Sequence, residues 1–501
     1  MAQQVDAGSE PGAIPLEDHV APQKDVVARG ARWAAGGQVT MHVSRMVITV
    51  VLARLILPQE RGLYAMALVV TDLLERVVAA TPGAGLIHVK ALTQRLVSSV
   101  FYFNILVGIG IAAVLALGSP VAAAMFGAPD VVPVLRAVGL CFIALSLGQA
   151  QRALLRRNFR FRAVAAADVT NALVQGGVSV WLAFRGWGTW ALVWGLLAGK
   201  LASNVVVWIA SPWRPSWMFS RDDVRSLRRF SGNLSAFSFF SYFQEAGDKF
   251  IVARIGQTAL GYYMLGYQQL LVPVDAVLSV SRNVLFPAFP RMEDDEAVAT
   301  GFVRSCAAVA VLFFPLGLGM TVVAGPFVRV ILGERWLPSV PVLGIFGVIA
   351  MINAVSNTTS VLFQSKGRTD LQLRWGVANG LLLLVAYLIG AQWGFVGVAW
   401  AFLIGTALCA VPGWLIPFSL IRLPFSRFLN ALTPVALATG VMAAAAYAVR
   451  LLLEHAHASQ PVVLFSAVVT GALVYGAILL TTRPQAVRDL VNLARPKATI
   501  T

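Results

Sequence analysis

Charged side chains recur at helical spacing inside stretches of this sequence that are otherwise almost entirely apolar. Two stretches carry the same pattern, in which an acid, two residues, a second acid and a base follow one another. The first acid and the base are four residues apart, so they can pair along one face of a helix. Ionisable groups in such surroundings are costly and usually mark a pathway for an ion or a substrate. The two patterns are Asp72, Glu75 and Arg76, and Glu245, Asp248 and Lys249.

Together with four further residues, these groups form a nearly neutral set of bases and acids. Because the two charges balance, we expect each base to be paired at rest and one base to be released to an anionic substrate. The acids are candidate carriers of a coupled proton or sodium ion. The bases, predicted to bind substrate, are Arg45, Arg76, Lys200, Lys249 and Arg282, and the acids are Asp72, Glu75, Glu245, Asp248 and Asp275.

A polar stripe precedes the first acidic pattern and returns about 200 residues later. Spacings of four, three and four residues place the members of each stripe on one helix face. An arginine in mid-membrane costs about 2.5–3.5 kcal/mol, so both stripes should face the protein interior. We expect His42 and Tyr242 to contact substrate and Arg45, which has no acid four residues away, to be the main anion-binding base; alternatively, the stripes only tie helices together. The stripes are Gln38, His42, Arg45 and Thr49, and Ser238, Tyr242, Glu245 and Lys249.

The elements that position these residues are membrane helices. Of 501 residues, 58% are hydrophobic and 12% are charged, and the mean hydropathy is +0.75. About fourteen apolar windows approach the roughly 20 residues that a membrane-spanning helix needs; one of them covers 340–363. The sequence therefore predicts an all-α, multi-pass membrane protein.

The distribution of charge predicts the orientation of these helices. Basic residues gather in alternate loops, such as 152–162 and 214–229, so both termini should be cytoplasmic. This topology accounts for the net charge of +16, and it makes membrane lipids, rather than nucleic acid, the expected partners of the basic loops. The first residues contain several acids and no apolar core, which disfavours a cleavable signal peptide. The three cysteines lie far apart in apolar windows, so we expect no disulfide.

Three blocks of sequence occur twice, in the same order and at nearly one offset. This repetition predicts two homologous bundles of six helices, related by an axis along the membrane normal, with two further helices. The predicted regions are a disordered cytoplasmic tail 1–28, a first bundle 29–210, a linker 211–229, a second bundle 230–420, two added helices 421–482 and a cytoplasmic tail 483–501. The blocks are Ala53-Arg54 and Ala253-Arg254, Val132-Pro133-Val134-Leu135 and Val340-Pro341-Val342-Leu343, and Trp187-Gly188 and Trp393-Gly394.

Several other chemistries are disfavoured. Gly199-Lys200 lacks the remainder of a phosphate-binding loop, and Gly195-x-x-x-Gly199 fits close helix packing. Glu454, His455 and His457 make a weak candidate for a metal site. We find no arrangement of nucleophile and base, and the outer loops are short. The sequence thus predicts a protein that is not an enzyme and needs no cofactor or metal.

With these motifs, the chain resembles the polysaccharide and lipid-linked oligosaccharide flippases of the multidrug/oligosaccharidyl-lipid/polysaccharide exporter superfamily. The resemblance rests on Ala53-Arg54-Leu55 through Gly62-Leu63-Tyr64-Ala65, Leu260-Gly261-Tyr262-Tyr263 through Gly266-Tyr267, Phe286-Pro287-Ala288 and Gly333-Glu334-Arg335-Trp336-Leu337-Pro338.

The resemblance implies alternating-access transfer of undecaprenyl-diphosphate-linked oligosaccharides from the inner to the outer leaflet of the bacterial inner membrane. It also implies a role in exopolysaccharide, capsule or O-antigen synthesis, with a polysaccharide polymerase and export machinery as further partners. Two alternatives stay open, namely a drug or organic-cation antiporter of the same superfamily and, less favoured, a membrane polymerase or ligase.

Overall fold

The chain folds into helices, as its composition requires. The computed structural model describes residues 44, 47–79, 92–220, 242, 245–285 and 294–482, with side chains except at 76–79 and 273–285. No β-strand occurs among these residues. Since a lipid interior offers backbone groups no water, a helix that bonds them internally is the favoured solution. The predicted all-α class is confirmed.

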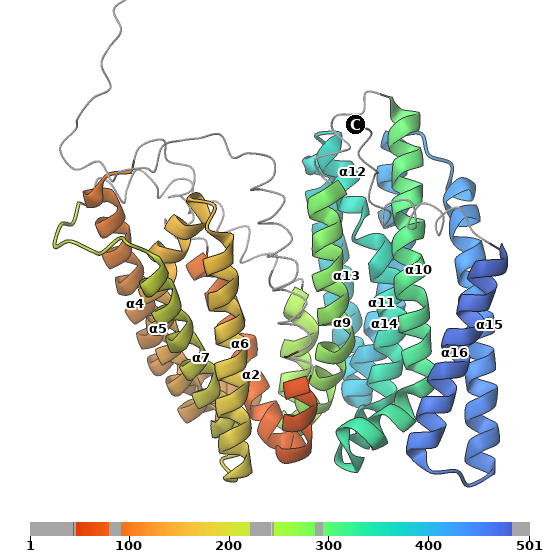
Figure 1. Ribbon diagram of the computed structural model, residues 1–501, viewed down its shortest axis with the longest axis horizontal. Coiled ribbons are helices and arrows are strands. Elements are labelled where there is room, and N and C mark those ends of the chain that lie inside the picture. Colours follow the sequence, from red (N-terminus) through yellow and green to blue (C-terminus); the bar gives the residue numbers. More distant parts are fainter. Residues whose placement is uncertain are drawn as a thin grey trace, which may run out of the picture. The chain divides into compact units, whose positions relative to one another are not determined.

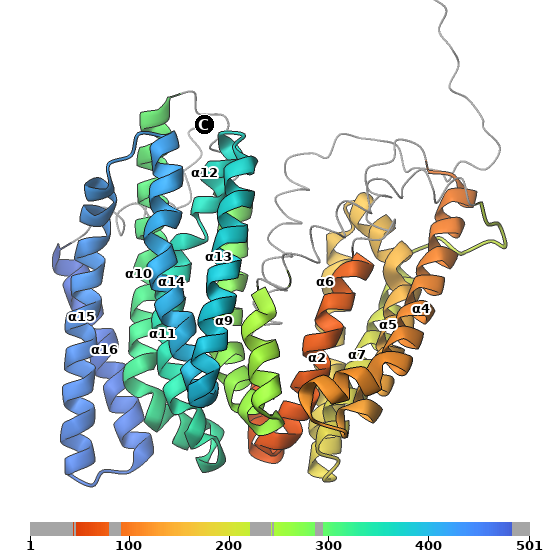
Figure 2. The ribbon, with the colours of Figure 1, turned by 180° about the vertical axis from the view of Figure 1, so that it is seen from behind.

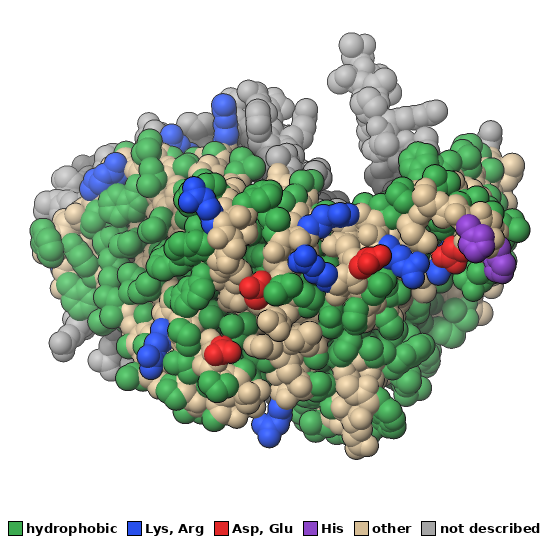
Figure 3. All heavy atoms as spheres, turned by 90° about the horizontal axis from the view of Figure 1, so that it is seen from below, with side chains coloured by type: hydrophobic (Ala, Val, Ile, Leu, Met, Phe, Trp, Pro, Cys, Tyr) green, Lys and Arg blue, Asp and Glu red, His purple; other side chains and the backbone are tan. Residues whose placement is uncertain are grey.

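Eight segments of the described chain are long and apolar enough to cross a membrane. One of them, Thr369–Leu420, contains two helices separated by a short turn. Large apolar side chains are exposed on these segments, including Leu117 at 81% and Leu473 at 68%. Hydrophobic side chains also predominate on the face drawn in Figure 3. Apolar exposure on this scale indicates contact with lipid; the count of fourteen spans stays a prediction.

The chain divides into two compact units, residues 1–246 and 247–501. In unit 1, helical residues 47–55 are followed by α2 (Pro58–Ala79), α4 (Gln94–Phe126), α5 (Val131–Arg157), α6 (Phe161–Phe184) and α7 (Thr189–Ala210) (Figure 1). Within the unit, α4 packs on α5, α6 on α7 and α5 on α7, while α2 contacts α5 and α7.

Unit 2 repeats this packing pattern. Here α10 packs on α11, α13 on α14 and α11 on α14, while α9 contacts α11 and α14 (Figure 2). Two C-terminal helices, α15 and α16, pack on each other and on α10. Its helices are the part of helix 245–255 from Gly247 onward, α9 (Gln257–Leu285), α10 (Asp295–Phe327), η2 (Val328–Leu332), η3 (Glu334–Ser339), α11 (Val340–Ser356), α12 (Thr359–Ser365), α13 (Thr369–Gly390), η4 (Ala391–Trp393), α14 (Gly394–Leu420), α15 (Phe425–His455) and α16 (Gln460–Thr482).

The repeated sequence blocks occupy equivalent places in the two units. Val-Pro-Val-Leu forms the first turn of both α5 and α11, where proline is tolerated because its missing N–H has no helical partner. Trp-Gly stands directly before α7 and at the start of α14, and Gly188 and Gly394 have φ values of 49° and 73°. Only glycine adopts this region without strain. The repeated sequence blocks therefore correspond to helix starts and turns that occur in both units. The predicted domain limits stay a prediction.

Closely approaching glycines fix the crossing of α10 and α11. A Cβ added to Gly347 would lie 2.3 Å from the Gly317 carbonyl oxygen, and one added to Gly317 would lie 2.4 Å from that of Gly347. In unit 1, a Cβ added to Gly195 would lie 2.8 Å from the Gln175 carbonyl oxygen of α6, and one added to Gly199 would lie 2.8 Å from that of Asn171. The packing role predicted for these two glycines is confirmed.

Gly347→Ala is therefore expected to lower the accumulation and thermal stability of the protein. The new methyl group meets backbone, which cannot rotate away, and overpacking of this kind costs about 1–3 kcal/mol. Gly344→Ala is the matched control, one turn earlier on the same helix, because its Cβ would meet only a Thr321 methyl group at 3.7 Å. Thermal unfolding of both purified variants would measure the difference; equal melting temperatures would contradict this account.

The predicted span 340–363 is not one helix. It is interrupted at Asn357 and Thr358, between α11 and α12. Three hydroxyls in this run donate to backbone carbonyls, namely Thr358 to Val355 (2.6 Å), Thr359 to Ser356 (2.7 Å) and Ser360 to Asn357 (3.0 Å). Such local bonds compete with the helical ladder. The predicted span 340–363 lies within one apolar segment, Glu334–Ser365, that is long enough to cross a membrane, but hydropathy does not register the break inside it.

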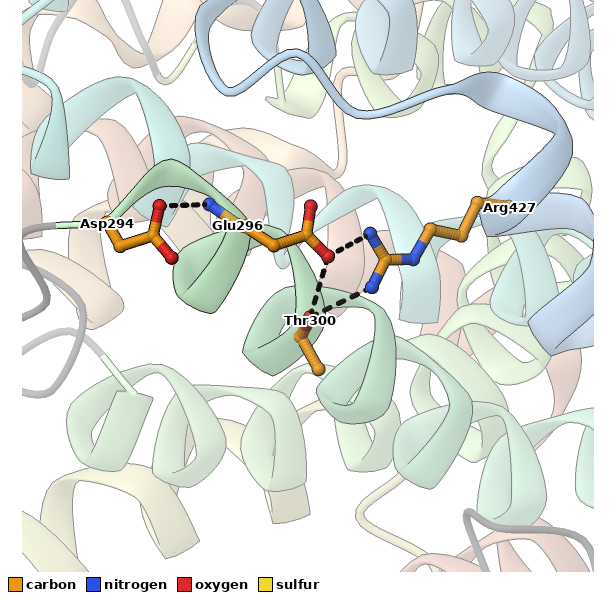
Figure 4. Close-up of polar contacts among 4 residues, drawn as sticks. All are labelled: Asp294, Glu296, Thr300 and Arg427. Atoms are coloured by element: carbon orange, nitrogen blue, oxygen red, sulfur yellow. Dashed lines mark hydrogen bonds and ion pairs between the residues drawn. The ribbon is translucent and has the colours of Figure 1, made fainter.

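Polar contacts fasten the start of α10 to α15 and to the loop before α13. The Asp294 carboxylate accepts the Glu296 N–H (3.1 Å), and the Arg427 guanidinium donates to Glu296 (2.6 Å) and to the Thr300 hydroxyl (2.9 Å) (Figure 4). Lys366 pairs with Asp295. Exposed ion pairs contribute at most about 1 kcal/mol each. These contacts therefore position the helix ends relative to one another and add little to the stability of unit 2.

Candidate functional site

An ion pair joins two helices of unit 1 inside an apolar span. Lys200 lies near the middle of α7, and its Nζ is 3.1 Å from Oε1 of Glu75 on α2. The side chains are 20% and 42% exposed, so the pair opens onto a surface of unit 1. An open surface lets another anion approach the ammonium group. The sequence placed both residues in the charged set, but only the contact between α2 and α7 pairs them.

A carboxylate is buried in unit 2. Asp248 is 2% exposed, and its Oδ2 accepts a hydrogen bond from the Tyr263 hydroxyl at 2.7 Å. Removing a carboxylate from water is costly unless donors replace the water. Tyr263, itself fully buried, supplies one such donor. Sequence reasoning noticed this tyrosine only as part of a family motif and missed its role.

The neighbouring base lies against an aromatic wall. The Lys249 Nζ is 3.9 Å from the centre of the Tyr267 ring, a geometry in which the ring attracts a cation by about 0.5–2 kcal/mol. Phe346 contacts both tyrosines edge-on, with ring centres 5.1 Å from Tyr263 and 6.1 Å from Tyr267. The result is an adjacent acid and base, Asp248 and Lys249, held by aromatic side chains.

The motif residues of unit 2 support this arrangement. The Tyr262 ring packs edge-on against Trp336 at 5.9 Å and lies 5.8 Å from Phe395. Trp336 is fully buried, and it follows Gly333, whose φ of 100° strongly favours glycine. Two motifs that lie far apart in the sequence thus meet, and together they orient the start of α9.

The other predicted residues are placed as follows. Asp72 and Glu245 are exposed. Tyr242 is buried, and its hydroxyl donates to the Val69 carbonyl, which gives this residue a packing contact. The predicted roles of all these residues stay predictions. The backbones of Arg76, Asp275 and Arg282 lie in α2 and α9, but their side chains, like the whole of His42 and Arg45, lie outside the described residues.

Three further features bear on the site. Arg152 on α5 pairs with Asp168 on α6 at 2.7 Å and also donates to Ser203 on α7, so one guanidinium ties three helices of unit 1. Cys141, Cys306 and Cys409 are free thiols. Within the described part of the chain, no group of three or more His, Cys, Asp or Glu residues could hold a metal ion.

The chain is similar in sequence to proteins of polysaccharide biosynthesis. The family model described as polysaccharide biosynthesis protein matches residues 51–341. The teichuronic acid biosynthesis protein TuaB of Bacillus subtilis (strain 168) is 26% identical over 481 residues, which cover 94% of this chain and 98% of TuaB. The succinoglycan biosynthesis transport protein ExoT of Rhizobium meliloti (strain 1021) is 26% identical over 483 residues, 94% of this chain and 96% of ExoT.

The fold also matches a solved structure. The lipid II flippase MurJ, in an inward closed conformation, aligns with a TM-score of 0.74 and covers 91% of this chain and 99% of MurJ. Sequence identity is 15%, so this likeness establishes the fold alone.

Proposed function

Because this chain belongs to the polysaccharide biosynthesis protein family, we propose that it is a flippase for lipid-linked oligosaccharides. It moves undecaprenyl-diphosphate-linked repeat units from the inner to the outer leaflet of a bacterial inner membrane, with both of its termini in the cytoplasm. The product supplies exopolysaccharide, capsule or O-antigen synthesis, and a polymerase and export machinery act on it next. The similarity to ExoT, a succinoglycan biosynthesis transport protein, supports this class.

The Glu75–Lys200 pair is the observation that carries the proposal. A diphosphate needs cationic donors inside the membrane, and Lys200 offers an ammonium group in mid-span whose carboxylate partner is partly exposed. The diphosphate exchanges with Glu75 for this ammonium. Lys249, and the predicted bases Arg45, Arg76 and Arg282, provide further positive charge along the path.

The energetics favour outward movement of such a substrate. Carrying negative charge toward a positive exterior releases about 2.3 kcal/mol per charge per 100 mV. The flipping of a diphosphate can therefore proceed without a coupled ion. If an ion is coupled, the predicted carriers are Asp72, Glu75, Glu245, Asp248 and Asp275, and we assign the coupling to Asp248 because its carboxylate is buried.

Two alternatives fit the observations less well. A drug or organic-cation antiporter needs acids without competing bases, whereas Glu75 is paired with Lys200 and Asp248 lies beside Lys249. A polymerase or ligase needs catalytic groups and room for an acceptor sugar, whereas the similarity to ExoT, a transport protein, favours a transporter.

Reconstitution in proteoliposomes tests the proposal. Lipid-linked oligosaccharide extracted from the producing bacterium would be placed in vesicles with the purified protein, and its exposure to a membrane-impermeant sugar oxidant would be followed. We expect oxidation to exceed the one-leaflet fraction only when the protein is present. An unchanged one-leaflet fraction, an extended glycan, or uptake of organic cations in its place would each overturn the assignment.

A further inference from the structure

We propose that a neutral polar cavity inside unit 2 binds one uncharged sugar ring of the transported oligosaccharide, an inference that rests on the proposed function. The cavity has a volume of about 240 Å³ and is formed by residues of α11 to α14 and of the break between α11 and α12. Asn357, at the interruption between α11 and α12, forms part of its lining. The residues used in the argument are Asn353, Asn357, Trp375, Asn379, Thr406 and Trp414.

The lining has the composition of a carbohydrate site. Amides and hydroxyls can each bond a sugar hydroxyl, while indole rings offer apolar faces to the C–H side of a sugar ring. None of the described residues that line the cavity is charged. Because neither phosphate nor carboxylate would find a counter-ion there, the cavity favours a neutral polar ligand over the anionic part of the substrate.

The cavity contains a polar atom that lacks a partner. The Asn379 Oδ1 is buried and has no hydrogen bond within the described structure. A buried acceptor without a donor is destabilising, and such exceptions often mark a place where a ligand or water belongs. Trp375 lines the same cavity as Asn379. A sugar hydroxyl donating to Asn379 would satisfy the carbonyl.

One aromatic wall of the cavity is held in place before any ligand arrives. The Trp414 indole N–H donates to the Ser356 hydroxyl at 3.1 Å. Its ring lies 6.5 Å from Phe425, in a stacked arrangement, and 5.3 Å from Phe428. A ring fixed by both a hydrogen bond and packing loses little freedom when it binds, which favours affinity.

The size of the cavity limits the ligand to a single ring. Sites for drug-sized molecules typically measure about 300–1,000 Å³, and this cavity is smaller. It therefore binds one sugar ring of the repeat unit. This gives the flippase a selectivity element for the glycan, separate from the bases that recognise the diphosphate.

Cys409 provides a native reporter because it also lines the cavity. In the variant Cys141→Ala/Cys306→Ala, it is the one remaining thiol of the chain. The purified full-length variant would be treated with methyl methanethiosulfonate, and the rate of modification would be measured by mass spectrometry. The probes are methyl glycosides of neutral hexoses and N-acetylhexosamines, with methyl glucuronide as the anionic comparison.

At least one neutral glycoside is expected to slow modification about tenfold when present at ten times its dissociation constant, and the glucuronide is not. Asn379→Leu, which removes the acceptor, should abolish this protection. Asn171→Leu is the matched control, since it removes a similarly buried and unpartnered amide oxygen from α6 of unit 1, and it should leave protection intact.

A cavity that holds water only would give equal rates with and without every neutral glycoside, and that result would overturn the inference. Protection by the glucuronide of equal strength, or protection that survives in Asn379→Leu, would overturn it too. The vesicle assay separates the two proposals. If the protein flips substrate but no glycoside protects Cys409, the sugar site is rejected and the flippase function stands. If a glycoside protects Cys409 but the protein does not flip substrate, the sugar site stands and the proposed function is rejected.

Discussion

Lys200→Met is expected to reduce flipping roughly 10- to 100-fold, because a charge-assisted contact of about 1.5–3 kcal/mol to the diphosphate is lost. The methionine keeps the length and packing of the aliphatic stem while it removes the charge. Lys200→Arg should keep part of the activity, since it preserves the charge but presents a planar group of different shape. Flipping in proteoliposomes, normalised to the amount of reconstituted protein, is the measurement.

The double variant Lys200→Met/Glu75→Gln separates substrate binding from structure. Replacing both members of an ion pair by neutral groups of similar size is often neutral or stabilising, so this protein should accumulate and melt like the wild type. If Lys200 serves only to neutralise Glu75, the double variant would flip normally. We expect it to be as inactive as Lys200→Met, and recovered activity would refute a role in diphosphate binding.

Asp248→Asn is expected to eliminate any response of flipping to an imposed proton or sodium gradient. Asparagine can still accept the Tyr263 hydroxyl, now at 2.7 Å from Asp248, so the local structure should persist while the ionisable group is gone. Flipping rates in vesicles with and without each gradient would be compared between Asp248→Asn and wild type. A gradient response of wild-type size in the variant would exclude Asp248 as the carrier.

Tyr263→Phe is the matched variant for Asp248. It removes the hydroxyl and leaves the buried carboxylate with one donor fewer, at a cost of about 1.5–3 kcal/mol for a bond to a charged group. We therefore expect a lower melting temperature together with a preserved gradient response. If Asp248→Asn instead lowered the melting temperature and kept the response of flipping to an ion gradient, Asp248 would have a structural role alone.

The repeat could be predicted from the sequence because its blocks report local requirements. Val132-Pro133 and Val340-Pro341 start helices, and Gly188 and Gly394 adopt positive φ angles, so each short motif carries its own physical reason. The break between α11 and α12 was missed for the opposite reason. Its cause is a set of hydrogen bonds from side-chain hydroxyls to backbone carbonyls, and a hydropathy average over a window does not detect such bonds.

The sequence by itself determined the class of the protein, its helical and membrane-spanning nature, and the set of intramembrane charges. These follow from composition and helical periodicity, which act along the chain. The tertiary structure alone decided the partners: Lys200 meets Glu75, 125 residues away, Tyr263 meets Asp248, and Asn379 faces a cavity with Trp375. Pairing across helices depends on which faces pack together, and that is fixed by close contacts such as Gly317 on Gly347.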